Sequence, residues 1–307
     1  MRVLLLCAVA LASLRAEALP RRIVAVEWLP LGLHGDVLDA LGAAADVKIE
    51  RESALGDAAE LDTLVAKVNS SPPAFVVGFG NRVCEELAVK CPGVPLLAVV
   101  GGPAAWCVKA ESPRTAPALV FVTEPEAGQV LAVAGRLLST LDTMAILYTE
   151  GYGANDALAD ALERDPARGE RKVVRLTVPP GNCRTDSDFE KALDDLPKEH
   201  GVTLLYVPDD PNCSRFGDVI CRLAAERNLV TLGSEAIEGK GCAAALVLNI
   251  GAVAKEGAAW MRRCYGAPST VEVRHAPYLV VLDEAVLAAQ GLTVKPWDEE
   301  VASPRSQ

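Results

Sequence analysis

The sequence predicts an α/β protein of two lobes, each a doubly wound parallel sheet covered by helices, with a cleft between the lobes. Strand-length apolar runs alternate along the chain with segments in which leucine and valine recur every three or four residues. Half of the residues are hydrophobic and only 5% are aromatic, which is typical of parallel strands buried on both faces. In mid-chain, Met144 to Leu162 contains a fresh strand, a glycine turn and a helix, which indicates the start of a second lobe.

The first lobe is predicted to hold five strands separated by helices. The strands are Ile23 to Trp28, Val47 to Glu50, Ala74 to Phe79, Leu96 to Val100 and Leu119 to Val122. The inner faces of the helices are marked by Val37, Leu38 and Leu41, by Leu61, Leu64, Val65 and Val68, and by Val83 and Leu87. A long amphipathic helix is then expected from Glu124 to Leu141. Alternation at this spacing favours right-handed crossovers and a parallel sheet.

The second lobe is predicted to repeat this arrangement. Its strands are Met144 to Tyr148, Lys172 to Val178, Thr203 to Val207, Val230 to Leu232 and Ala244 to Leu248, and a long helix follows from Ile250 to Cys264. We expect the strand Tyr278 to Leu282 and the short helix Asp283 to Ala289 to return to the first lobe. The predicted division is therefore residues 19-141 plus 266-302 for lobe 1 and 142-265 for lobe 2 with its crossover helix, followed by a disordered tail, 303-307.

The first eighteen residues have the pattern of a secretory signal peptide. Arg2 precedes an apolar segment, Val3 to Leu14, which is too short to span a bilayer, and Ala16-Glu17-Ala18 is a small-residue cleavage site. Cys7 could mark a lipid anchor, but the apolar segment continues past it. We therefore expect cleavage after Ala18 and a periplasmic protein.

Removal of the signal peptide would change the net charge and the number of cysteines. Loss of Arg2, Arg15 and Glu17 changes the formal net charge from −11 to −12, which disfavours nucleic acid and anionic membranes as partners. Loss of Cys7 leaves eight cysteines, and an oxidising compartment favours disulfides. Loop positions favour pairing Cys84 with Cys107 and Cys183 with Cys213, although many other connectivities are open.

No motif predicts catalysis, a metal site or a cofactor. Gly78-Phe79-Gly80 supplies two glycines of a dinucleotide fingerprint, but Val83 occupies the third position, so a tight turn is the favoured interpretation. The histidines His34, His200 and His275 are scattered and are expected at the solvated surface. Asp209-Asp210 could be an acid/base pair, but a turn with a helix cap is favoured. There is no phosphate loop and no nucleophile elbow, so we expect a protein that is not an enzyme.

Polar and aromatic residues recur just after the predicted strands. Ligands of open α/β sheets bind outside the carboxyl ends of the strands. The candidate ligand contacts are therefore Trp28, Phe79, Asn81, Trp106, Thr123, Glu124, Tyr148, Tyr152, Asp209, Ser234 and Glu235. For each of them, the alternative is an ordinary loop or capping residue.

Four segments in the second half of the chain carry a family resemblance. They are ALVFVTEPEAGQVLAVAGRLLSTLDTMAILYTEGYGANDALADAL, LLYVPDDPNC, LVTLGSEAIEGKGCAAALVLNIGAVAKEGAAWM and PYLVVLDEAVLAAQGLTV. Together they make the chain, over roughly Ala118 to Val294, similar to the ABC-transporter substrate-binding family with a type I periplasmic binding fold. The resemblance implies two lobes that close on a small organic ligand and pass it to an ABC permease in the inner membrane. Family contacts carried over by position would include Thr123, Tyr148, Asp209, Ser234 and Glu235.

The first lobe departs from the family pattern in its apolar loops. Trp28 to Leu33 reads Trp-Leu-Pro-Leu-Gly-Leu, and Ala104-Ala105-Trp106 lies in another loop on the expected cleft side. Leucines that line a crevice need an apolar cover. We therefore hypothesise a monomer with a hydrophobic or aromatic ligand, unless these leucines pack against neighbouring loops. The alternative functions are a ligand-sensing or lipid-shuttling periplasmic protein that works with a membrane partner and, less favoured, a secreted α/β enzyme.

Overall fold

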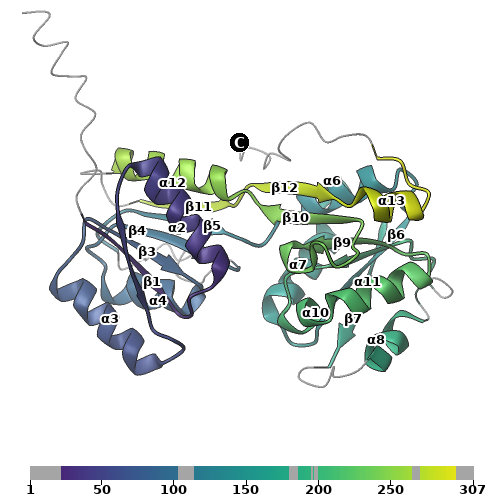
Figure 1. Cartoon of the computed structure of the whole chain (residues 1–307), viewed down its shortest axis with the longest axis horizontal. Helices are drawn as coiled ribbons and strands as arrows, with labels where there is room; N and C mark the ends of the chain where they lie inside the picture. The colour runs from purple at the N-terminus through teal and green to yellow at the C-terminus, as the bar shows by residue number, and fades with distance from the viewer. Residues whose placement is uncertain are drawn as a thin grey trace, which may run out of the picture. The chain divides into compact units, whose positions relative to one another are not determined.

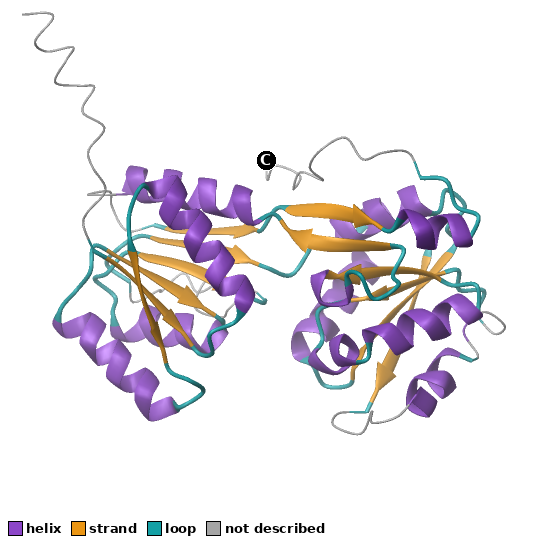
Figure 2. Cartoon of the chain, viewed as in Figure 1, coloured by secondary structure: helices purple, strands orange, loops and turns teal. Residues whose placement is uncertain are grey.

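The computed structural model describes residues 22–102, 114–179, 186–194, 196, 200–264 and 270–294. These residues form two compact units. Unit 1 comprises the described residues up to Val122 together with Ile250–Arg274, and unit 2 comprises Thr123–Asn249 with the described residues from His275 onward. Each unit has its own sheet with helices packed on it (Figures 1 and 2). The prediction of two mostly parallel α/β lobes is confirmed.

Unit 1 is built on a six-stranded sheet in the order β11-β5-β4-β3-β1-β2. Its strands are β1 (Ile23–Glu27), β2 (Ile49–Ser53), β3 (Phe75–Phe79), β4 (Leu96–Val100), β5 (Ala118–Val122) and β11 (Val271–His275). Its helices are α2 (Gly32–Ala45), α3 (Ala58–Ser70), α4 (Asn81–Lys90) and α12 (Ile250–Cys264). All pairings among β1 to β5 are parallel. Helices α3 and α4 share one face of the sheet, and α2 packs with α12 on the other (Figure 1).

Unit 2 is also built on a six-stranded sheet, in the order β12-β10-β9-β8-β6-β7. Its strands are β6 (Thr143–Thr149), β7 (Lys172–Val178), β8 (Leu204–Val207), β9 (Val230–Ser234), β10 (Ala244–Leu248) and β12 (Tyr278–Leu282). Its helices are α6 (Ala127–Leu137), α7 (Gly153–Arg164), α8 (Asp186–Leu193), α10 (Pro211–Arg215), α11 (Gly217–Glu226) and α13 (Glu284–Ala289). Only β12 is antiparallel to its neighbour among the described pairings of this sheet.

Strand alternation builds two cores in unit 2, one on each face of its sheet. On β6, Ile146 and Tyr148 join the core that α6, α7 and α13 cover, whereas Ala145 and Leu147 join the core beneath α8 and α11. All seven residues of this strand are buried. Burial on both faces explains why the strand reads as a continuous apolar run rather than as an alternating one.

The observed units differ from the predicted division at four elements. Helix α6 packs into unit 2, where Val130 and Ala134 share a core with Met144, and α12 belongs to unit 1. Strand β12 and helix α13 also stay in unit 2, and the part of the chain that returns to the first sheet is β11, which the sequence did not predict. Helical spacing defines an apolar face but not the sheet that the face covers, because tertiary packing decides the partner.

Cysteines and chain hydropathy complete the description. No disulfide joins any two of the six cysteines that the structure describes. Cys107 and Cys183 lie outside the described residues, as do Trp106, the predicted signal peptide and the predicted tail, so both proposed disulfide pairs stay predictions. Among the described residues, no helix has both the length and the apolar character needed to cross a bilayer.

Candidate functional site

An aromatic and charged group of side chains stands at the carboxyl ends of β1 and β3 in unit 1. We call Glu27, Trp28, His34, Phe79 and Arg82 the aromatic set. Glu27 and Phe79 are direct neighbours across the two strands. The His34 ring stacks on Phe79 with centroids 4.4 Å apart, and the Arg82 guanidinium lies 4.2 Å from the centroid of the Trp28 ring. Stacked rings and a cation over an indole restrict each other's rotamers, so this edge presents an ordered surface.

The glycines around Phe79 explain how the aromatic set is positioned. A Cβ on Gly78 would lie 2.9 Å from the Cys84 sulfur, so glycine allows α4 to pack closely on β3. Gly80 has φ +85°, a conformation that favours glycine, and it turns the chain directly into α4. Asn81 and Arg82 therefore begin the helix at the strand end, where both are exposed. The favoured interpretation of Gly78-Phe79-Gly80 as a tight turn is confirmed.

His34 and Glu27 form a part-buried pair that the sequence did not predict. Glu27 is only 4% exposed, and His34 Nδ1 lies 2.9 Å from its Oε2 atom. The prediction that His34 is a solvated surface residue is wrong, because 16% of its side chain is exposed. A buried carboxylate needs a hydrogen-bond partner. A glutamate at a strand end, followed by a histidine in the next helix, was the available signal.

A second group, rich in carboxylates and phenols, lies in unit 2 around the carboxyl ends of β6 and β8. We call Glu124, Tyr152, Tyr206, Asp209 and Tyr278 the acidic set. The Tyr278 hydroxyl donates a hydrogen bond to the Thr123 carbonyl. His275 Nδ1 lies 3.1 Å from the Glu124 carbonyl. These contacts hold the segment after β5 against the start of β12.

Burial and mutual repulsion shift the titration of the acidic set. Desolvation and the nearby Asp209 carboxylate raise the pKa of Glu124 from 4.5 to about 7. Partial desolvation and the adjacent Asp210 raise the pKa of Asp209, which nevertheless keeps an exposed surface. Burial and the carboxylates of Glu124 and Asp209 raise the pKa of Tyr206. Deprotonation of these groups is therefore disfavoured. A ligand that donates hydrogen bonds to the carboxylates would offset the repulsion between them.

Asp210 follows Asp209 in the chain, is fully buried and holds the turn after β8 in place. Its carboxylate accepts hydrogen bonds from the backbone N–H groups of Asn212 and Cys213, each at 3.0 Å, and caps α10. It also accepts from the Thr149 N–H at 2.9 Å and the Thr149 hydroxyl at 2.7 Å. These hydrogen bonds lower the pKa of Asp210 despite its burial. The favoured interpretation of the Asp209-Asp210 pair as a turn with a helix cap is confirmed for Asp210.

The remaining candidates from the sequence take varied positions. Tyr148 is 1% exposed in the core of unit 2, with its hydroxyl toward Asp156, so it does not join the acidic set. Ser234 is buried at the end of β9, and its hydroxyl has no hydrogen-bond partner among the described residues. Glu235 is exposed, and its Oε2 lies 3.4 Å from the Leu248 nitrogen. Sequence reasoning missed Tyr206 and Tyr278 because both read as ordinary strand residues.

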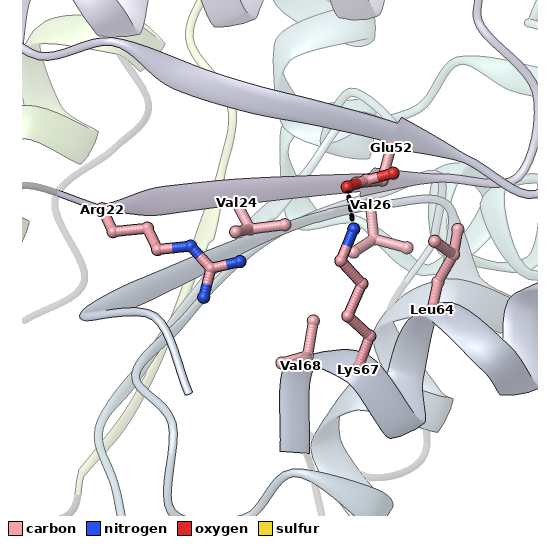
Figure 3. A pocket seen from close by; sticks show the side chains of 7 residues that line it. All are labelled: Arg22, Val24, Val26, Glu52, Leu64, Lys67 and Val68. Carbon is pink, nitrogen blue, oxygen red and sulfur yellow. Dashed lines mark hydrogen bonds and ion pairs between the residues drawn. The ribbon is translucent and has the colours of Figure 1, made fainter. Parts of the chain in front are cut away.

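Three hollows within the described parts of the individual units lie at different distances from these two sets. The pocket of Figure 3, between β1, β2 and α3, has a volume of only about 10 Å³, and the Lys67–Glu52 ion pair of 2.5 Å crosses it, so it holds one water at most. An open hollow of about 370 Å³ adjoins the aromatic set and shares Glu27 with it. A third hollow, of about 480 Å³, lies at the opposite, amino ends of β6 and β7, away from the acidic set.

The described residues contain no group of three or more His, Cys, Asp or Glu side chains that could hold a metal ion. The site chemistry of both sets is instead that of hydrogen bonding, stacking and charge, which suits recognition of a small molecule.

Comparison with known proteins identifies the fold. No protein-family model matches the chain, and no curated protein matches its sequence. A substrate binding protein with adhesive properties from Clostridium difficile matches its structure with a TM-score of 0.71 and 15% identity, covering 94% of this chain and 100% of that one. An ABC domain in complex with L-Trp from Streptococcus pneumonia gives 0.63 and 13%, covering 90% and 96%.

A sugar ABC transporter (sugar-binding protein) from Bacillus halodurans gives a TM-score of 0.61 and 12% identity, covering 88% of this chain and 99% of that one. All three are matched over nearly their whole length, so the likeness extends over both units. The chain therefore has the α/β fold of the substrate-binding proteins of ABC transporters, the type I periplasmic binding protein fold.

Proposed function

We propose that the chain is an exported solute-binding protein of an ABC importer and that the aromatic and acidic sets supply its ligand contacts. The observation that carries the proposal is the placement of the aromatic and acidic sets. Glu27 and Phe79 end β1 and β3 in unit 1, and Tyr152 and Asp209 follow β6 and β8 in unit 2. Open α/β sheets bind ligands at such carboxyl ends. The likeness to substrate-binding proteins supports the same role. The protein would act in the periplasm as a monomer, after cleavage at Ala18, and deliver its solute to a membrane permease.

The proposed ligand is a small organic molecule with an apolar or aromatic face and polar groups. Leu29 and Leu31 remain 45% and 55% exposed beside the aromatic set, which favours an apolar cover over packing against neighbouring loops. The carboxylates and phenols of the acidic set favour hydrogen-bond donors on the ligand. A purely lipid-like ligand would leave these polar groups unmatched, so a ligand of mixed character fits better.

A thermal-shift screen of the full chain tests the proposal. The panel holds aromatic amino acids, aromatic amines, hexoses and a medium-chain fatty acid. A true ligand at about 100 times its Kd adds ~2.7 kcal/mol of stability, which raises Tm by about 4 °C in a protein of this size. Trp28→Ala and Glu124→Gln should each abolish the shift, whereas Leu55→Ala, at a 72% exposed position outside both sets, should retain it.

If no compound shifts Tm, or if both site variants respond like the wild type, the proposed binding role is wrong. A ligand-sensing protein would give the same shifts, because it would use the same sites. Reconstituted uptake with a candidate permease separates the two roles, since only an importer subunit accelerates solute entry into vesicles.

A further inference from the structure

We propose that the acidic set of unit 2 binds the ammonium group of an organic amine, so that the preferred solute is a cation with an apolar body. This inference rests on the proposed function and names the ligand class for it. It distinguishes amines from sugars, fatty acids and organic anions, all of which the fold alone would allow.

The carboxylates of the acidic set have no cationic partner within the described residues. Asp209 and Glu124 lie close enough to repel each other, and neither forms an ion pair with a lysine or arginine there. The other ionisable groups that influence this site are Asp210, Glu235 and the phenols of Tyr152, Tyr206 and Tyr278, all of them neutral or acidic. The imidazole of His275 contacts the Glu124 carbonyl and lies 3.6 Å from Glu126, outside the set. The site therefore carries an excess of negative charge.

Two buried side-chain oxygen atoms of unit 2 have no hydrogen-bond donor among the described residues. Asn155 is fully buried, and its Nδ2 donates to the Asp209 carbonyl at 3.4 Å and to Asp210 at 3.3 Å. The Oδ1 atom of the same carboxamide has no hydrogen-bond partner among the described residues. Ser234 is 8% exposed, and its hydroxyl is likewise unpartnered there. Buried polar atoms are rarely left unpaired, so these acceptors indicate that the site takes a donor from outside the chain.

Strand alternation places Ser234 on the face of the acidic set. Tyr206 and Leu232 are cross-strand neighbours that belong to the same core of unit 2, and Ser234 follows Leu232 by two residues on β9. Side chains two residues apart on a strand point to the same face. The Ser234 side chain therefore projects on the same side of the sheet as the Tyr206 phenol, whose pKa is raised by burial and by the charges of Glu124 and Asp209.

An ammonium group fits this combination better than the other ligand groups do. It brings a positive charge and up to three N–H donors, which matches two carboxylates and unpaired oxygen acceptors. A sugar hydroxyl donates one hydrogen bond without charge, and a carboxylate or phosphate would be repelled. Asp210 is excluded as the anchor, because Thr149, Asn212, Cys213 and Asn155 already occupy its oxygen atoms.

Isothermal titration calorimetry on the full chain tests the inference with two probes that share a ring and chain length. Tryptamine carries an ammonium group, and tryptophol carries a neutral hydroxyl at the same position. At pH 8 an alkylammonium is still protonated. We expect tryptamine to bind at least tenfold more tightly than tryptophol. Glu124→Gln and Asp209→Asn should each reduce this preference several-fold, whereas Glu150→Gln, an exposed carboxylate outside the set, should preserve it.

The outcomes separate the inference from the function on which it rests. Equal or tighter binding of tryptophol, or binding of a hexose with no response to either indole, overturns the amine assignment and leaves a solute-binding protein in place. Absence of binding for every class in the screening panel overturns the proposed function. If the variants fail to fold, the ratio of the two affinities in the wild-type protein still decides the question.

Discussion

Replacement of Asp210 by alanine should unfold the edge of unit 2 that carries the acidic set. The substitution removes the N-cap of α10, which costs about 1 kcal/mol. It also leaves the N–H and hydroxyl of Thr149 without their acceptor, and an unsatisfied buried donor costs about 1–3 kcal/mol. Because Thr149 ends β6 and Asn212 lies in the first turn of α10, the carboxylate joins two elements that are distant in sequence. We expect a total loss of about 4 kcal/mol.

Urea unfolding followed by circular dichroism measures this loss. With a denaturant slope of about 2 kcal/mol/M, the midpoint should fall by about 2 M. The two units can unfold separately, so hydrogen exchange should locate the effect. Peptides from Thr143–Thr149 and Pro211–Arg215 should lose protection, while those from Ile23–Glu27 should keep it.

Asp209→Asn is the matched control for this prediction, because Asp209 is exposed and its charge is disfavoured by Asp210. It should leave the midpoint unchanged or raise it slightly. If Asp210→Ala unfolds within about 0.5 M of the wild type, or if the two variants behave alike, the carboxylate does not tie β6 to α10 as described.

Three further predictions follow from burial and close packing. Folding raises the pKa of Glu124 to about 7, so the contribution of Glu124 to the free energy of unfolding is present below about pH 4.5 and is lost as pH rises through 7, by at most about 3 kcal/mol. Thermal melts at several pH values should show that Glu124→Gln reduces this dependence of stability on pH. An unaltered dependence would contradict the prediction. Gly78→Ala should cost about 1–3 kcal/mol in urea unfolding, since its Cβ would meet the Cys84 sulfur, and a neutral effect would refute the close approach. Burial raises the pKa of Cys221 to about 12 and of Cys242 to about 11, so both thiols should resist iodoacetamide at pH 8 until urea is added, and rapid labelling of the native protein would show them accessible.

The fold was predictable from the sequence because its strands are local features. β3 and β6 are apolar runs whose ends the sequence located within one residue, since burial on both faces leaves no polar interruptions. The pairing of elements was harder to predict. The apolar face of α6 is visible in the sequence, but its place against Met144 rather than against the first sheet depends on packing between distant residues.

The candidate site was predictable only in part. Glu124, Tyr152 and Asp209 were expected from their positions after strands, and the structure groups their carboxylates and phenol together. Tyr148 was expected beside them, but it is buried in the core of unit 2 and its hydroxyl pairs with Asp156 instead. His34 was missed because its partner, Glu27, lies on another element, and spacing within one helix or strand does not show such a contact.

Calorimetric titration of the strongest solute from the thermal-shift panel tests whether the aromatic and acidic sets bind the ligand. We expect one solute bound per chain and a loss of binding in Trp28→Ala and in Glu124→Gln, because we propose both sets as ligand contacts. Binding that survives both substitutions, or that needs only one of the two sets, would contradict this proposal.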